Sequence, residues 1–228
     1  MRRLAAIGIA VVALPMGACG DNRAIGQQQS GARTGTEQIL SLRDGRYSKH
    51  GWNHYGPGHF ELDEQTGILT TRGGMGLLWY AVRQYQDFVL ELDFKTASRT
   101  SNSGVFLRVP GVPTSDDYIY HSFEVQIDDA SDGVHQTGAV YDAEAPSTRA
   151  SRPPGEWNHY RITFQGDHIL VELNGRKVVD WTAEPRGKVV DFARRGYIGL
   201  QNHDDRSPVY FRNIYIKDLS GNSKSGSS

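Results

Sequence analysis

Apolar side chains recur at every second residue through much of this chain, which is the period of a β-strand with one buried face. Residues 88–95 and 160–164 show this alternation most clearly. The segments 169–173 and 176–181 flank Asn174-Gly175, which predicts a tight hairpin because both turn positions favour positive φ. Further strands are predicted at 68–71, 77–81, 103–109, 122–128, 137–141, 196–202 and 209–217.

This density of short strands predicts an all-β fold, a jelly-roll β-sandwich of two antiparallel sheets. Helical signal is confined to short segments near 37–42 and 189–194. The 26 glycines and 11 tyrosines also favour a turn-rich β fold. The hydrophobic fraction of 38% is enough for one sizeable core. The formal net charge of -1 argues against a non-specific nucleic-acid binder, which needs a basic surface to neutralise phosphates.

The first residues of the chain differ in composition from the rest. A basic start at Arg2-Arg3 and an apolar stretch over 4–14 have the form of an export signal and are too short to span a bilayer. Small residues then precede Cys19, the one cysteine of the chain. This pattern resembles a bacterial lipoprotein signal, in which that cysteine is lipidated. An ordinary export signal that has Cys19 near its cleavage site by chance is the alternative.

These patterns divide the chain into four parts: a lipoprotein signal peptide over 1–18, a flexible tether over 19–36, a β-sandwich domain over 37–219 and a disordered polar tail over 220–228. We therefore expect an exported bacterial lipoprotein that is anchored to a membrane through Cys19, in the periplasm or on the cell surface. A single cysteine excludes an internal disulfide.

One predicted strand carries polar side chains opposite its apolar face. In residues 122–128 the apolar side chains occupy the odd positions and are expected to enter the core. The even positions then place Glu124, Gln126 and Asp128 on the other face. If the strands with similar alternation are its neighbours, this polar face displays Arg108, Glu124, Gln126, Asp128, Tyr141, Gln201 and His203.

Two interpretations of this face are open. A solvated outer face is ordinary in an antiparallel sheet. However, the face mixes aromatic side chains with planar hydrogen-bonding groups and avoids Lys and Thr, which favours a carbohydrate site.

No cofactor is expected, because the chain has no phosphate-cradling Gly loop, dinucleotide fingerprint or nucleophile elbow. Asp128, Asp129 and Asp132 offer oxygen ligands for a structural calcium ion, although their spacing misses the EF-hand pattern. Three histidines between residues 50 and 59 lie in a Gly-rich run without a cysteine pattern. We interpret them as loop-packing residues rather than as a zinc site.

Nine short segments are spread in order over most of residues 50–217: Gly73–Tyr80, Tyr85–Phe88, Asn102–Arg108, Phe123–Ile127, Thr137–Tyr141, Gly155–Asn158, Val171–Gly175, Gly199–His203 and Phe211–Ile214. In these segments the chain resembles the bacterial 3-keto-disaccharide hydrolase domain family. The resemblance implies a concanavalin-like jelly-roll sandwich. It also implies a carbohydrate partner, namely glycosides or disaccharides whose glucose unit carries a ketone at C3.

The implied chemistry requires three kinds of group. A C3 ketone acidifies the proton on C2, so a base that removes this proton can expel the C1 substituent, and water can add afterwards. The reaction therefore needs a base, an acid for the departing oxygen and a donor that polarises the ketone.

We predict Glu124 or His203 as the base, and the other of the two or Asp128 as the acid. The remaining candidates are predicted to hold the substrate: Arg108, Gln126 and Gln201 at the ketone and hydroxyls, and Trp79 and Tyr141 beside the sugar ring.

Other functions remain open: a non-catalytic carbohydrate-binding module, a surface interaction protein, or an enzyme that hydrates an unsaturated 3-keto sugar. A laminarinase-type glycosidase is disfavoured. Its Glu-x-Asp-x-Glu strand is replaced here by Glu124-Val125-Gln126-Ile127-Asp128. The two carboxylates are about 13 Å apart along a strand, whereas double displacement needs about 5–5.5 Å.

Overall fold

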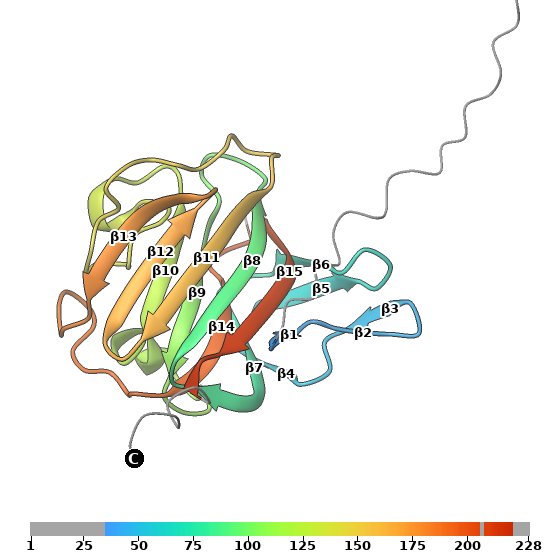
Figure 1. The fold of residues 1–228 in the computed structure, drawn as a ribbon. Helices are drawn as coiled ribbons and strands as arrows, with labels where there is room; N and C mark the ends of the chain where they lie inside the picture. Colours follow the sequence, from blue (N-terminus) through green and yellow to red (C-terminus); the bar gives the residue numbers. More distant parts are fainter. Residues whose placement is uncertain (1–34, 206–207, 221–228) are drawn as a thin grey trace, which may run out of the picture. The chain divides into compact units, whose positions relative to one another are not determined.

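Strands account for the regular structure of the domain, apart from short 3₁₀ turns. The computed structural model describes residues 35–205 and 208–220, which belong to the unit Gly35–Ser228. In this unit an eight-stranded sheet lies in front of a five-stranded sheet (Figure 1). Strand pairing within both sheets is antiparallel, so the predicted all-β sandwich is confirmed.

The larger sheet consists of β1 (Thr36–Gln38), β5 (His59–Asp63), β6 (Ile68–Arg72), β8 (Phe88–Thr96), β11 (Asn158–Gln165), β12 (His168–Leu173), β13 (Arg176–Thr182) and β15 (Val209–Asp218). Its order is β13-β12-β11-β8-β15-β6-β5, and β1 pairs with β15.

The smaller sheet consists of β4 (Trp52–Tyr55), β7 (Gly76–Tyr85), β9 (Asn102–Val109), β10 (Phe123–Asp128) and β14 (Gly196–Asn202). Its order is β10-β9-β14-β7-β4. A separate hairpin joins β2 (Ser41–Arg43) and β3 (Arg46–Ser48), and two short 3₁₀ helices are η1 (Asp116–Tyr120) and η2 (Gly133–His135).

The core lies between the two sheets and is filled by the alternating apolar residues. The four inward residues of β8 are fully buried. The pairing of β8 with β11 sets Phe88 opposite Phe164. The ring of Phe164 meets that of Phe123 from the smaller sheet edge to face, with the centroids 5.3 Å apart. Side chains of the two inner faces therefore interdigitate, as is usual in β-sandwiches.

The predicted hairpin forms at Asn174-Gly175. Both residues have positive φ, 53° and 77°, as a two-residue turn between twisted strands requires. The Asn174 amide also accepts a hydrogen bond from the backbone N–H of His159 at 2.9 Å and donates to Oδ1 of Asn158 at 2.8 Å. The turn is thereby fastened to β11.

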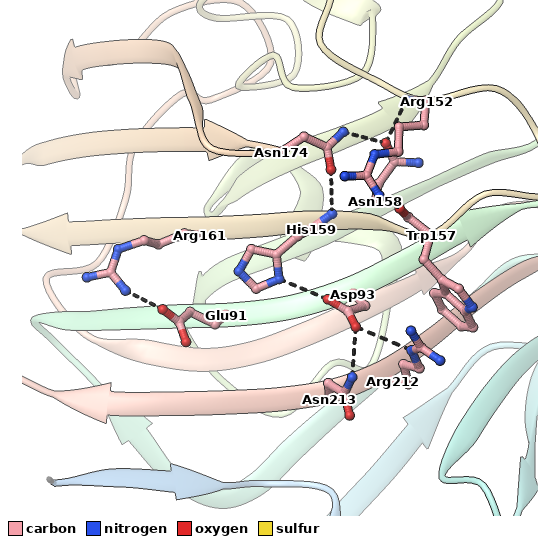
Figure 2. Close-up of polar contacts among 10 residues, drawn as sticks. All are labelled: Glu91, Asp93, Arg152, Trp157, Asn158, His159, Arg161, Asn174, Arg212 and Asn213. Carbon is pink, nitrogen blue, oxygen red and sulfur yellow. Dashed lines mark hydrogen bonds and ion pairs between the residues drawn. The ribbon is translucent and has the colours of Figure 1, made fainter. Parts of the chain in front are cut away.

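A polar network covers part of the outer face of the larger sheet (Figure 2). Asp93 lies at its centre. Its Oδ1 is 2.9 Å from Nδ1 of His159, and its Oδ2 accepts hydrogen bonds from Nε of Arg212 at 3.3 Å and Nδ2 of Asn213 at 2.7 Å. The Arg212 guanidinium also lies 3.9 Å from the ring centroid of Trp157. The network therefore ties β8, β11 and β15 together.

Some local predictions are wrong. Residues 37–42 contain the ends of β1 and β2 instead of a helix, because pairing with β15 at the sheet edge outweighs the local preference. Residues 189–194 are irregular. Residues 137–141 hydrogen-bond along the edge of β10, but φ at Gly138 is 94° and turns the backbone, so that only Val140 forms a β-bridge.

The predicted signal peptide over 1–18 lies outside the described residues. So do the predicted tether over 19–36, except residues 35–36, and the tail over 220–228, except Ser220. Among the residues of the two described ranges, no helix has the length and hydropathy needed to cross a membrane.

Candidate active site

The outer face of the smaller sheet carries a second apolar cluster. Leu77, Trp79, Phe106 and Val109 pack there with Tyr118. The 3₁₀ helix η1 supplies Tyr118, whose ring lies edge-on to that of Phe106 at a centroid distance of 5.0 Å. This part of the sheet is therefore buried on both faces, and a polar group on its outer face is shielded from water.

Strand pairing aligns a row of residues across this face. Glu124 on β10 pairs with Phe106 on β9, Phe106 pairs with Gly199 on β14, and Gly199 pairs with Trp79 on β7. At the edge of the sheet, the N–H of Tyr141 donates to the carbonyl oxygen of Glu124 at 2.8 Å. We call this set, Tyr141, Glu124, Phe106, Gly199 and Trp79, the Glu124 row. Its members share one face, as the alternation predicted for Glu124 and Tyr141.

The carboxyl group of Glu124 is buried against the backbone of β9. Only 6% of the residue is exposed. A Cβ at Gly104 would lie 1.9 Å from Oε1 and 2.5 Å from Cγ of Glu124, so the glycine provides the space for this side chain. Burial raises the pKa of Glu124 to about 8, and the positive charge of Lys188 offsets part of that rise. A group with this pKa can gain or lose a proton near neutral pH.

Buried polar atoms without a protein partner lie on the same face. Nε1 of Trp79, the hydroxyl of Tyr118 and Oε1 of Gln201 have no hydrogen-bond partner in the described part of the chain. With its amide turned to the orientation that its neighbours favour, the Gln126 side-chain nitrogen donates to Oε1 of Glu124 at 3.2 Å and to the backbone carbonyl oxygen of Ser103 at 3.0 Å. Because a buried polar atom is costly when unpaired, these atoms favour a ligand that has hydroxyl and carbonyl groups.

Lys188 brings a positive charge to the edge of this face. Its Nζ donates to the hydroxyl of Tyr141 at 3.3 Å and lies 4.9 Å from the ring centroid. Desolvation lowers the pKa of Lys188, but the hydrogen bond and the charge of Tyr141 outweigh it, so that the pKa is raised overall. Sequence reasoning missed Lys188 and Tyr118, because both come from segments without an alternating pattern. The one local signal is Gly187, which is typical of a turn.

The prediction that Arg108 lies on the same polar face as Glu124 is wrong. Arg108 is fully buried, and its guanidinium lies 3.5 Å from the ring centroid of Phe164 in the core. The cause is a β-bulge: Arg108 has φ of 56°, and β9 has one more residue than β14 between paired positions, which interrupts the alternation. The guanidinium donates to the backbone carbonyls of Gln86 and Gly166.

Asp128 and His203 lie away from the Glu124 row. Both carboxylate oxygens of Asp128 are engaged in the turn after β10, by the N–H of Ala130 at 2.8 Å and the hydroxyl of Ser131 at 2.6 Å. His203 follows the end of β14, where it is exposed and its Nδ1 lies 3.1 Å from Asp204. Of the groups predicted as acid or base, Glu124 is the one that the fold places in the buried row.

The carboxylates predicted as calcium ligands have protein partners. In addition to the turn at Asp128, Asp129 accepts a hydrogen bond from Thr137 Oγ1 at 2.7 Å, and Asp132 pairs with Arg149. Within residues 35–205 and 208–220, no three or more His, Cys, Asp or Glu residues are grouped so that they could hold a metal ion.

Solved structures with the same fold include a protein of unknown function and a carbohydrate-binding module. A Bacillus subtilis protein of galectin-like fold superposes with a TM-score of 0.56 at 13% identity, covering 80% of this chain and 94% of that one. The carbohydrate-binding module CBM66 from Bacillus subtilis gives a TM-score of 0.54 at 18% identity, covering 74% and 96%. These likenesses concern the fold alone. Fold and site together define a galectin-like jelly-roll sandwich with a buried carboxyl group of raised pKa.

Closer relatives specify the family. The sequence model of the 3-keto-alpha-glucoside-1,2-lyase-like domain matches residues 39–217, and the chain belongs to this family. The 3-keto-disaccharide hydrolase of Bacteroides thetaiotaomicron is 25% identical over an alignment of 231 positions that covers 79% of this chain and 78% of the relative. A Parabacteroides distasonis crystal structure assigned as a glycosyl hydrolase has a TM-score of 0.68 at 27% identity, covering 81% and 99%. The resemblance seen in the sequence is confirmed, and these relatives indicate a glycosyl hydrolase of the 3-keto-disaccharide hydrolase type.

The raised pKa of Glu124 predicts a pH-dependent stability. Its pKa is about 8 in the folded protein against 4.5 for the ordinary side chain. Between these two pH values the carboxyl group ionises in the unfolded chain but keeps its proton in the folded protein. The free energy of unfolding therefore falls as the pH rises from about 4.5 to about 8. Glu124→Gln cannot ionise. It should exceed the wild type in free energy of unfolding by on the order of 3 kcal/mol at alkaline pH and converge with it in acid. Urea unfolding at several pH values measures the difference.

Glu156→Gln is the matched control, because Glu156 is exposed in the turn before β11. This variant should follow the wild type at every pH. If Glu124→Gln also follows the wild type throughout, the carboxyl group of Glu124 is hydrated and this description of the site is wrong.

Proposed function

We propose that this protein cleaves glycosides whose glucose unit carries a ketone at C3, with Glu124 as the base that removes the proton from C2. The observation that carries the proposal is a buried carboxyl group of raised pKa that shares one sheet face with unpartnered buried polar atoms. The relative named as a 3-keto-disaccharide hydrolase supports the substrate class.

The pKa of Glu124 suits this chemistry. Removal of the C2 proton gives an enolate that is delocalised onto the C3 oxygen, and this enolate expels the oxygen on C1. A carboxylate of raised pKa is a stronger base than an ordinary one. Water then adds at C1 of the double bond, so that the overall reaction is hydrolysis.

The unpartnered atoms suit the polar groups of the sugar. Negative charge develops on the C3 oxygen during the reaction, and fixed donors stabilise it best where water is excluded. The Trp79 N–H and the Tyr118 hydroxyl are the donors that we assign to this oxygen. Gln201 Oε1 is the acceptor for a sugar hydroxyl, and Gln126 orients the base through its hydrogen bond to Oε1 of Glu124.

The position of Glu124 depends on the missing side chain at residue 104. Gly104→Ala adds a methyl group that overlaps Cγ and Oε1 of Glu124 and should rotate the carboxyl group out of place. We expect kcat/KM to fall by about 100-fold or more, because small displacements of a reacting group are costly. Gly111→Ala is the control: a Cβ there meets no atom within 4 Å, so activity should not change. Similar kinetics for the two variants would argue against Glu124 as the base.

The substrate class is tested with a nitrophenyl glucoside and the same glucoside oxidised at C3. The purified protein should release nitrophenol from the oxidised compound alone. The rate should rise with pH as the base ionises, with an apparent pKa near 8. Glu124→Gln should lose at least about 100-fold in kcat, since general bases contribute this much or more, and Glu156→Gln should match the wild type.

The other outcomes of this assay separate the alternatives. Release from the unoxidised glucoside would identify an ordinary glycosidase. Sugar binding in calorimetry without release from either compound would favour a carbohydrate-binding module or an enzyme that hydrates an unsaturated 3-keto sugar.

We also propose that the chain is exported and anchored to a membrane by a lipid on Cys19. The support is the signal-like order of basic, apolar and small residues before the one cysteine of the chain. Mass spectrometry of protein from the membrane fraction should find a lipid-modified N-terminal cysteine, and Cys19→Ser should move the protein out of that fraction. An unmodified Cys19 within the exported chain would contradict this proposal.

A further inference from the structure

Tyr141 and Lys188 form a pair beside Glu124. Val140 and Val125 form an antiparallel bridge, and the next pair of residues is Tyr141 and Glu124. Side chains at such opposed positions have Cβ atoms about 5 Å apart. Lys188 lies in the loop between β13 and β14 and contacts the hydroxyl of Tyr141, and its positive charge lowers the pKa of Glu124. One carboxyl group, one phenol and one ammonium therefore lie within interaction distance at the edge of the sheet.

A hydrogen-bonded turn over residues 186–189 holds Lys188 in this position. Arg186 and Val189 exchange two backbone hydrogen bonds, of 2.9 and 3.0 Å, across the turn. Gly187 has φ of 58°, and a Cβ on it would lie 1.8 Å from the carbonyl oxygen of Asp142, so the turn packs directly against the residue that follows Tyr141. Val189 is buried in the core. The ammonium group is thus held against Tyr141 from a fixed backbone.

We propose that the hydroxyl of Tyr141 is the acid that protonates the departing glycosidic oxygen, and that Lys188 is the positioning residue that stabilises the phenolate left behind. The inference rests on the proposed function and supplies the acid that this reaction requires. Asp128 and His203, the other candidates for this role, lie outside the Glu124 row.

The cleavage step balances with these two residues. Glu124 takes the proton of C2, and the electron pair of that C–H bond forms the double bond between C1 and C2. The bond between C1 and the glycosidic oxygen breaks, and its electron pair goes to the oxygen, which takes the proton of Tyr141. The site then holds a protonated Glu124 and a Tyr141 phenolate beside the ammonium of Lys188.

Addition of water restores both residues. The phenolate takes a proton from water while the water oxygen bonds to C1, and Glu124 returns its proton to C2. The product is the free 3-keto sugar.

The test compares two leaving groups. Nitrophenolate departs without a proton, whereas the oxygen of an alkyl glucoside needs one. With a C3-oxidised alkyl glucoside, Tyr141→Phe should lose at least about 100-fold in kcat, as expected for loss of a general acid. With the C3-oxidised nitrophenyl glucoside, it should lose less than about 10-fold. Lys188→Met should show the same selectivity, and Lys188→Arg should recover much of the loss because it keeps the charge.

Lys177→Met is the control, because Lys177 is exposed on β13 in the larger sheet and should affect neither substrate. Thermal unfolding verifies that each variant is folded, and Lys188→Met decides the question if Tyr141→Phe does not fold. Equal losses on both substrates, or none on either, would overturn the inference while the proposed function stands. If the wild type cleaves neither oxidised substrate, the proposed function fails and the inference fails with it.

Discussion

Aromatic side chains cover part of the outer face of the smaller sheet, and the chemistry of the site depends on this cover. The inner face of the sheet packs against the larger sheet, while Trp79, Phe106 and Tyr118 shield the outer face. Glu124 lies next to Phe106 in the Glu124 row and close to Tyr118, and the loss of hydration there raises its pKa. Lys188 acts in the opposite direction, so desolvation rather than a neighbouring charge sets the pKa.

The alternation of apolar residues predicted the sandwich well, because burial on one face imposes a period of two on any strand. The same rule placed Glu124, Gln126, Gln201 and Tyr141 on one face, which the strand pairing reproduces, but it also placed Arg108 there, and the structure buries Arg108 in the core. The alternation could not show whether water reaches that face. Its exposure depends on η1, a short 3₁₀ helix outside the alternating pattern that carries Tyr118 over the sheet.

The errors in the predicted site have local causes. The left-handed backbone at Arg108 reverses the side of the sheet that its side chain reaches, and a non-glycine residue in this conformation has no reliable sequence signal. Lys188 lies in a turn that reaches Tyr141 only because Gly187 packs against Asp142, a contact between segments far apart in sequence. Alternation therefore identifies the residues of a sheet face, whereas the loops that complete a site require the folded structure.

Much of the family resemblance lies away from Glu124. The segments around Trp157-Asn158, Asn174 and Arg212-Asn213 meet in the network on the outer face of the larger sheet (Figure 2). In this chain these segments link strands of the larger sheet and lie away from Glu124, so the resemblance could identify the family without identifying the base.

Asp93 on the larger sheet and Glu124 on the smaller sheet show how the surroundings of a carboxyl group suit it to a structural role or to proton transfer. Burial raises the pKa of Asp93, but hydrogen bonds from His159 and Asn213 and the charge of Arg212 lower it overall, and both of its oxygens are engaged by protein groups. Glu124 has a raised pKa, one hydrogen bond from the Gln126 amide, and unpartnered polar atoms on the same face. Hydrogen bonds and a neighbouring charge therefore favour the charged form of Asp93 as a structural link, whereas burial favours the protonated form of Glu124, which is why we propose Glu124 as the catalytic base.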